Sequence, residues 1–140
     1  MKVMIDTNVV LDVLLRREPF FQASYEVMKQ SALEQIEGFV SAAAATDLFY
    51  LLRRALGDRQ AAKENLEKLM QLVGFADELG EDVHAALASN MPDFEDALVS
   101  AIAERCKMDC IVTRNIKDFE NSPVVALTPE AFLEKTGGKG

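Results

Sequence analysis

The chain has 140 residues, 49% of them hydrophobic and 27% charged, which is enough for one domain with a substantial core. Its formal net charge of −8 argues against a general nucleic-acid coat protein, which would carry a basic surface, but does not exclude a nuclease. No apolar stretch approaches the length of a membrane span and the first residues do not resemble a secretory signal, so we expect a soluble cytoplasmic protein.

Apolar residues in the first half recur with the spacing of short strands and amphipathic helices in alternation. Strands are expected at residues 2–5 and 38–40, and each is followed by a helix-forming run. The expected helices are a buried one at residues 8–15, one starting at Pro19, one at 42–56 capped by Ser41 and ended by Gly57, and one capped by Asp58.

The second half continues this alternation and completes the prediction of the fold. Residues 72–76 are consistent with either a strand or a frayed helix end. The other expected elements are a helix at 81–88, a helix from Asp93 to Cys106, strands at 110–113 and 124–127, and a terminal helix starting at Pro129. This order predicts an α/β fold with a central parallel sheet of four or five strands and helices on both faces. We expect a single domain over residues 1–135 and a disordered tail at 136–140.

Four segments place carboxylates where an apolar run ends. Acids at the carboxyl ends of strands and the starts of helices lie where an open α/β sheet gathers its ligand site. Carboxylates gathered there repel one another, and protonation or a bound divalent cation must relieve that repulsion. An all-oxygen cluster favours a hard cation such as Mg²⁺ or Mn²⁺. The candidate acids are Asp6, Asp47, the group Asp93, Glu95 and Asp96, and Asp118.

Each of these acids also has a purely structural interpretation. Asp6 is placed to cap the first helix, and Asp47 is an ordinary first-turn acid favoured by the helix dipole. Asp93 with Asp96 resembles a capping box, although three acids in four positions exceed what capping needs. Asp118 is placed to cap a turn.

Basic residues close to the candidate site segments offer a local phosphate-binding rim on an acidic body. Arg16 and Arg17 follow the first helix, and Arg114 follows the strand at 110–113. We therefore expect these three side chains to hold an RNA backbone if the protein is a nuclease. The alternative is that they are solvated residues at the ends of helices.

The acid-bearing segments together resemble the PIN-domain family of metal-dependent ribonucleases. The family's first motif resembles the opening MIDTNVVLDVL, and its second acid-bearing helix resembles SAAAATDLFYLLRRAL. The third and fourth motifs, run together, resemble PDFEDALVSAIAERCKMDCIVTRNIKDF. The resemblance spans residues 1–132 and is to a small bacterial branch with DFEDAL and TRNxKDF signatures, relatives of VapC-type toxins of toxin–antitoxin pairs.

This resemblance implies a three-layer α/β/α fold and an endoribonuclease, often a homodimer, that uses one or two Mg²⁺ or Mn²⁺ ions per site. The ions would activate water for attack on the scissile phosphorus of RNA. A toxin of this type would also have an antitoxin protein as its partner. The positions carried over are Asp6, Asp47, Asp96 and Asp118 as catalytic and metal-holding acids, and Asn8, Asp93, Thr113 and Asn115 as supporting polar residues.

Two positions depart from the family pattern. Asp47 stands where many members have Glu, and Asn115 stands where many have the fourth acid, which leaves Asp118 as the candidate substitute. These departures keep open an alternative, a catalytically impaired module that binds RNA or protein. A phosphoryl-transfer enzyme of another kind is disfavoured, because no Asp-x-Asp motif follows the first strand and no glycine-rich phosphate loop is present.

Overall fold

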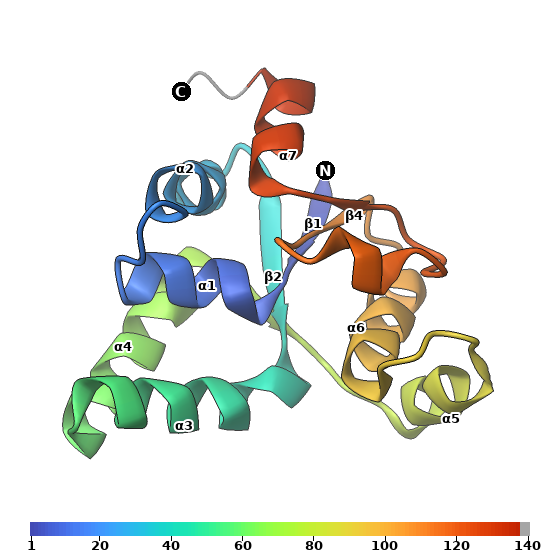
Figure 1. Ribbon diagram of the computed structural model, residues 1–140, viewed down its shortest axis with the longest axis horizontal. Helices are drawn as coiled ribbons and strands as arrows, with labels where there is room; N and C mark the ends of the chain where they lie inside the picture. The colour runs from blue at the N-terminus through green and yellow to red at the C-terminus, as the bar shows by residue number, and fades with distance from the viewer. Residues whose placement is uncertain (138–140) are drawn as a thin grey trace.

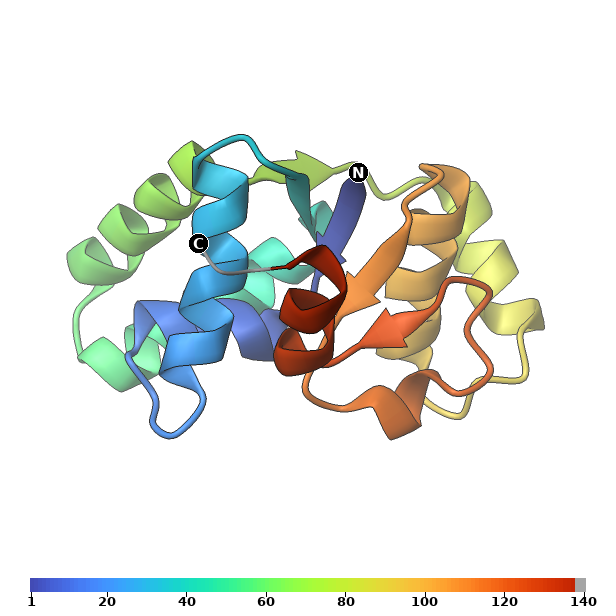
Figure 2. The ribbon, with the colours of Figure 1, turned by 90° about the horizontal axis from the view of Figure 1, so that it is seen from above.

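Five parallel strands form the centre of the molecule, and helices cover both faces of the sheet (Figures 1 and 2). The computed structural model describes residues 1–137. The strand order is β3-β2-β1-β4-β5, and all four strand pairs are parallel. This confirms the expected α/β class with three layers. The strands are β1 (Lys2–Ile5), β2 (Glu37–Ser41), β3 (Gly74–Ala76), β4 (Cys110–Val112) and β5 (Ala126–Leu127).

α-Helices connect the first four strands in turn, as parallel pairing favours, while β4 is connected to β5 by a loop with one 3₁₀ turn. Side chains that accept a backbone N–H hydrogen bond begin several of these helices, among them Asp58 and Thr128, and Gly57 ends one of them with a left-handed φ of 69°. The helices are α1 (Thr7–Leu14), α2 (Phe21–Ala32), α3 (Ala45–Leu56), α4 (Arg59–Leu72), α5 (Gly80–Ala88), α6 (Phe94–Arg105) and α7 (Pro129–Thr136), with 3₁₀ turns η1 (Ala42–Ala44) and η2 (Ile116–Phe119).

The core is divided by the sheet into two apolar layers. Val3 and Ile5 of β1 pack with buried residues of α1, α2, α3 and α4 on one face. Met4 lies on the other face and packs with α5 and α6. This alternation follows from the two-residue period of a strand, which sends successive side chains to opposite faces.

The structure moves several predicted boundaries. The second helix begins at Phe21, because Pro19 lies in the preceding turn. Gly74–Ala76 is a strand, and the helix predicted to reach Cys106 ends at Arg105. The last strand comprises Ala126–Leu127 alone.

The chain end partly falls outside the structure. Thr136 is the last residue of α7 and Gly137 ends that helix, so the helix extends past the predicted domain boundary at 135. The rest of the predicted tail, residues 138–140, lies outside the described residues. Within residues 1–137 no helix combines the length and the apolar character needed to cross a membrane.

Candidate functional site

Asp6 lies at the carboxyl end of β1 and begins α1. Its Oδ1 accepts a hydrogen bond of 2.9 Å from the backbone N–H of Thr7, so the expected capping role is real. Its Oδ2 accepts bonds from Thr113 Oγ1 at 2.7 Å and from Asn8 Nδ2 at 3.3 Å. The same carboxylate also lines a surface cleft, and the two roles therefore coexist.

The side chains of Asp6, Asn8 and Thr113 join the β1–α1 turn to the loop after β4. Thr113 is fully buried, and its Oγ1 accepts bonds from the backbone N–H of Asn115 at 3.1 Å and from Asn8 Nδ2 at 3.4 Å. Asn8 Oδ1 accepts a bond of 3.2 Å from the backbone N–H of Arg114. Thr113 therefore does not itself line the cleft but fixes Asp6, while Asn8 and Asn115 do line it.

The start of α6 brings three further acids to the cleft. Asp93 caps this helix by accepting a bond of 3.0 Å from the backbone N–H of Glu95. The predicted capping box is not formed, because within the described residues the Asp96 side chain accepts no bond from the backbone N–H of Asp93. Glu95 lies close enough to Asp47 of α3 for the negative charge of Asp47 to raise the pKa of Glu95. Capping alone does not account for this crowding.

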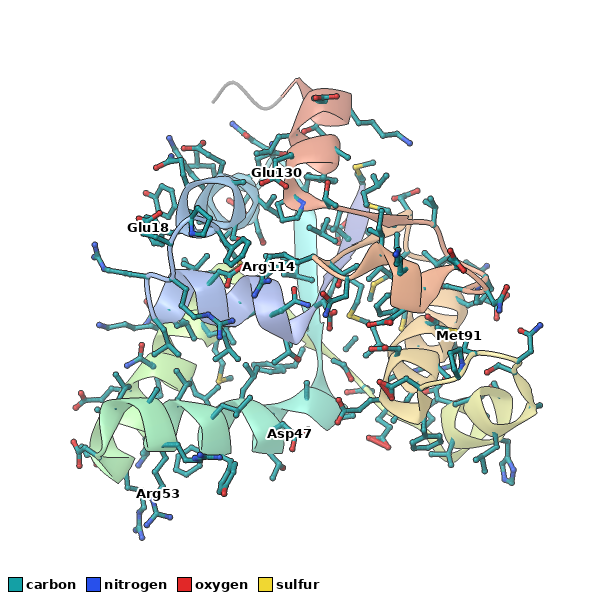
Figure 3. The ribbon with its side chains drawn as sticks, in the orientation of Figure 1. Glu18, Asp47, Arg53, Met91, Arg114 and Glu130 are labelled. Atoms are coloured by element: carbon teal, nitrogen blue, oxygen red, sulfur yellow. The ribbon has the colours of Figure 1, made fainter. Side chains whose placement is uncertain are left out.

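The cleft measures about 530 Å³ and lies at the carboxyl edge of the sheet. Helices α1, α3 and α6 and the loop after β4 surround it, with Asp47 and Arg114 coming from different elements (Figure 3). A smaller cavity of about 190 Å³, lined in part by Ser41 and Glu78, shares its wall. The acids that line the main cleft are Asp6, Asp47, Asp93, Glu95, Asp96 and Asp118.

Burial and mutual repulsion raise the pKa of three of these acids, Asp6, Glu95 and Asp96. The pKa of Asp96 is raised to about 7, first by burial and then by the negative charges of Asp93 and Asp6. Burial also raises the pKa of Asp6, against the opposing hydrogen bond from Thr113, and the charge of Asp118 adds to it. The pKa of Glu95 is raised by burial and by Asp47. Asp118 thus acts on the cluster electrostatically, a contribution that the uncharged amide of Asn115 cannot make.

The donor set fits a hard divalent cation in its chemistry. The six acids that line the cleft offer only carboxylate oxygens, which suit Mg²⁺ or Mn²⁺. A cation bound there would relieve the repulsion that helps to raise the pKa of Asp96. Within residues 1–137, however, no three His, Cys, Asp or Glu side chains are grouped closely enough to hold an ion directly. Ligation through water, which Mg²⁺ commonly retains, is compatible with this spacing.

The three arginines that were expected to bind RNA do not share one environment. Arg17 and Arg114 line the cleft. Arg16 does not line it and instead lies 5.7 Å from the centre of the Phe21 ring.

Two groups of residues in or behind the cleft wall had no place in the sequence prediction. Asp12 of α1 is fully buried and forms ion pairs with both cleft arginines. A single acid within the apolar run of residues 9–15 was a usable signal for it. The apolar and aromatic lining, which includes Leu11, Tyr50 and Leu51, carried no distinguishing signal.

Comparison with known proteins identifies the family of this architecture. The family model described as "PIN domain" matches residues 2–117. No curated protein matches the chain in sequence.

Solved structures share the fold at low sequence identity. VapBC2 from Rickettsia felis, bound to a DNA fragment from their promoter, has a TM-score of 0.73 at 16% identity, covering 91% of this chain and 98% of that chain. A toxin-antitoxin complex from Klebsiella pneumoniae has a TM-score of 0.67 at 19% identity, covering 91% and 97%. VapC20 from Mycobacterium tuberculosis, described as a sarcin-ricin loop cleaving toxin, has a TM-score of 0.61 at 14% identity, covering 78% and 86%.

Proposed function

This chain belongs to the PIN domain family, and from that premise we propose that it is a Mg²⁺- or Mn²⁺-dependent endoribonuclease. The observation that carries the proposal is the gathering of six carboxylates in one cleft, where the pKa of Asp96 rises to about 7. A cluster of like charges this close is costly unless it binds a cation. A perturbed carboxylate in a cleft is also a typical mark of a functional site.

The proposed roles follow from where each side chain lies. Asp6, Asp96 and Asp118, with Asp47, would hold one or two ions directly or through water. A bound ion would activate water for attack on the scissile phosphorus and neutralise charge on the phosphate. Asp93 lies beside Asp96, and its negative charge adds to burial in raising the pKa of Asp96 to about 7.

Supporting residues position the acids and the RNA. The hydrogen bond from Thr113 holds Asp6 Oδ2 in one orientation. Asn8 ties the loop after β4 to α1, since it bonds both Asp6 and the backbone N–H of Arg114. Arg17 and Arg114 are the basic side chains that line the cleft, so they are the ones we assign to the RNA backbone. Arg16, which lies outside the cleft, is not needed in this arrangement.

We further propose that the nuclease is the toxin of a toxin–antitoxin pair and forms a homodimer. The similarity in fold to VapBC2 and to a toxin-antitoxin complex supports the partner. Induced expression in a bacterial host should arrest growth, and co-expression of a small protein encoded by the adjacent gene should relieve the arrest. Light scattering on the purified protein tests the dimer.

The decisive test is cleavage of a mixed RNA pool with Mg²⁺, with Mn²⁺ and with EDTA. We expect cutting that needs metal and is lost in Asp6→Asn. Glu104→Gln is the matched control, because it removes an exposed acid from α6 outside the cleft and should cut normally. Metal-dependent cutting by Asp6→Asn would refute the assignment. Failure of the folded wild-type protein to cut, with RNA still bound, would favour the impaired binding module.

A further inference from the structure

Asp12 of α1 is fully buried and has three side-chain partners. Its Oδ2 accepts bonds from Arg114 Nε at 2.7 Å and Ser24 Oγ at 3.2 Å, and its Oδ1 accepts bonds from Arg17 Nε at 3.1 Å and Arg114 Nη2 at 3.2 Å. Its exposed fraction is 0%. A buried carboxylate is costly unless charged partners surround it, and here two guanidinium groups do so.

Both arginines keep part of their hydrogen-bonding capacity. Arg114 donates to Asp12 through Nε and Nη2. Arg17 donates to Asp12 through Nε, while its Nη2 lies 3.1 Å from Asp12 Oδ1 and donates to the carbonyl oxygen of Asn8 at 3.2 Å. Within residues 1–137 no hydrogen bond uses the Nη1 group of either arginine. Each guanidinium therefore retains donors for a further acceptor.

The orientation of Arg114 is restricted from a second side. Its guanidinium lies 3.9 Å from the centre of the Phe20 ring, and its side chain is 26% exposed. Stacking of this kind and the planar fork bound to Asp12 together leave the guanidinium few alternative positions. Arg114 and Arg17 carry two positive charges against the single negative charge of Asp12. The trio thus has a net charge of about +1 at the wall of an otherwise acidic cleft.

We propose that Asp12 is a positioning residue, which holds Arg17 and Arg114 together as a binding site for the phosphates of an RNA chain entering the cleft. This inference rests on the proposed function. An acidic cleft repels a polyanion, so the substrate needs cations at a fixed place beside the acids. Two fixed guanidinium groups meet phosphate oxygens with less loss of side-chain freedom than two mobile ones.

The experiment compares RNA affinity in Asp12→Asn and the wild-type protein. Anisotropy of a labelled single-stranded RNA, measured in EDTA, gives Kd, and circular dichroism checks folding. We expect Asp12→Asn to raise Kd about tenfold, as for the loss of one charged hydrogen bond. The slope of log K against log salt should become shallower by about 0.7 for each phosphate that the variant no longer neutralises. In cleavage assays KM should rise while kcat stays within about twofold.

A comparison of combined variants tests whether Asp12 acts on RNA binding through the two arginines or only stabilises the surrounding structure. If Asp12 acts through the two arginines, adding Asp12→Asn to Arg17→Gln with Arg114→Gln should weaken RNA binding no further. Arg53→Gln is the control, since Arg53 projects from the end of α3 remote from Arg114 and should bind normally (Figure 3). If Asp12→Asn does not fold, Arg114→Lys replaces it, because lysine keeps the charge but loses the fork.

The outcomes distinguish this inference from the proposed function. Folded Asp12→Asn, or Arg114→Lys in its place, that binds RNA as tightly as the wild-type protein would overturn the positioning role. The positioning role would also be overturned if adding Asp12→Asn to the Arg17→Gln, Arg114→Gln variant weakened RNA binding as much as Asp12→Asn does alone. RNA binding that depends on Asp12 without any cleavage would refute the nuclease and leave this inference standing. No RNA binding by the wild-type protein would overturn both.

Discussion

The raised pKa of Asp96 should make the metal-free protein less stable as the pH rises. A carboxyl whose folded-state pKa lies above its unfolded value holds its proton more tightly in the folded state. Its stabilising contribution is therefore complete below the unfolded pKa of 3.8 and is lost as the pH rises through about 7. In metal-free protein, stability should fall from about pH 4 to pH 7.

The size of the effect follows from the shift and from the exposure of the side chain. A rise from 3.8 to about 7 is about 3 pH units, which would correspond to about 4 kcal/mol for a fully buried group. Asp96 is only partly buried, and solvent screening reduces the expected effect to about 1 kcal/mol. For a domain of this length that amounts to about 3 °C in Tm.

Thermal unfolding in EDTA across this pH range measures the effect. Asp96→Asn should reduce the fall in Tm, and the control Glu104→Gln should leave it unchanged. Asp82 does not contribute to this change. Burial alone would raise its pKa, but the hydrogen bonds from Arg105 outweigh burial and lower the pKa, so Asp82 changes the stability only below about pH 4. Equal pH dependence in Asp96→Asn and the wild-type protein would refute the view that crowding at Asp96 strains the fold.

Three further outcomes are expected. Mg²⁺ or Mn²⁺ should raise the Tm measured by differential scanning fluorimetry, because a ligand at 100 times its Kd adds about 2.7 kcal/mol to the free energy of unfolding. Asp6→Asn should lose most of this gain, and an undiminished gain would contradict the assignment of Asp6 as a metal ligand. Thr113→Val removes the hydroxyl that donates to Asp6 at 2.7 Å, so it should lower the free energy of unfolding in urea by about 1–2 kcal/mol and reduce cleavage. Full cleavage activity would show that Thr113 does not support the site. Leu52→Ala, at a fully buried position, should cost about 2–5 kcal/mol, against little for the exposed Met70→Ala, and similar losses would contradict the described core.

Local sequence determined the layers of the fold and the edge at which the acids gather. Alternation of short apolar runs with helical spacing is enough to predict a parallel sheet, because parallel strands need crossover helices. The position of Asp6 directly after a buried strand then places it at the carboxyl edge, since every strand of such a sheet ends there. The same reasoning, applied to the sequence alone, places Asp118 and the start of α6 at that edge.

Tertiary structure alone decided which charges meet. Asp12 and Arg114 are 102 residues apart, and only the pairing of β1 with β4 brings α1 and the loop after β4 together. Arg16 and Arg17 are adjacent and identical, yet Arg16 has a left-handed φ of 49° in the turn after α1 and Arg17 alone reaches Asp12. Local propensity and periodicity describe each segment separately. The partner of a charged side chain depends instead on how distant loops converge, which is settled when the sheet assembles and its two faces are packed.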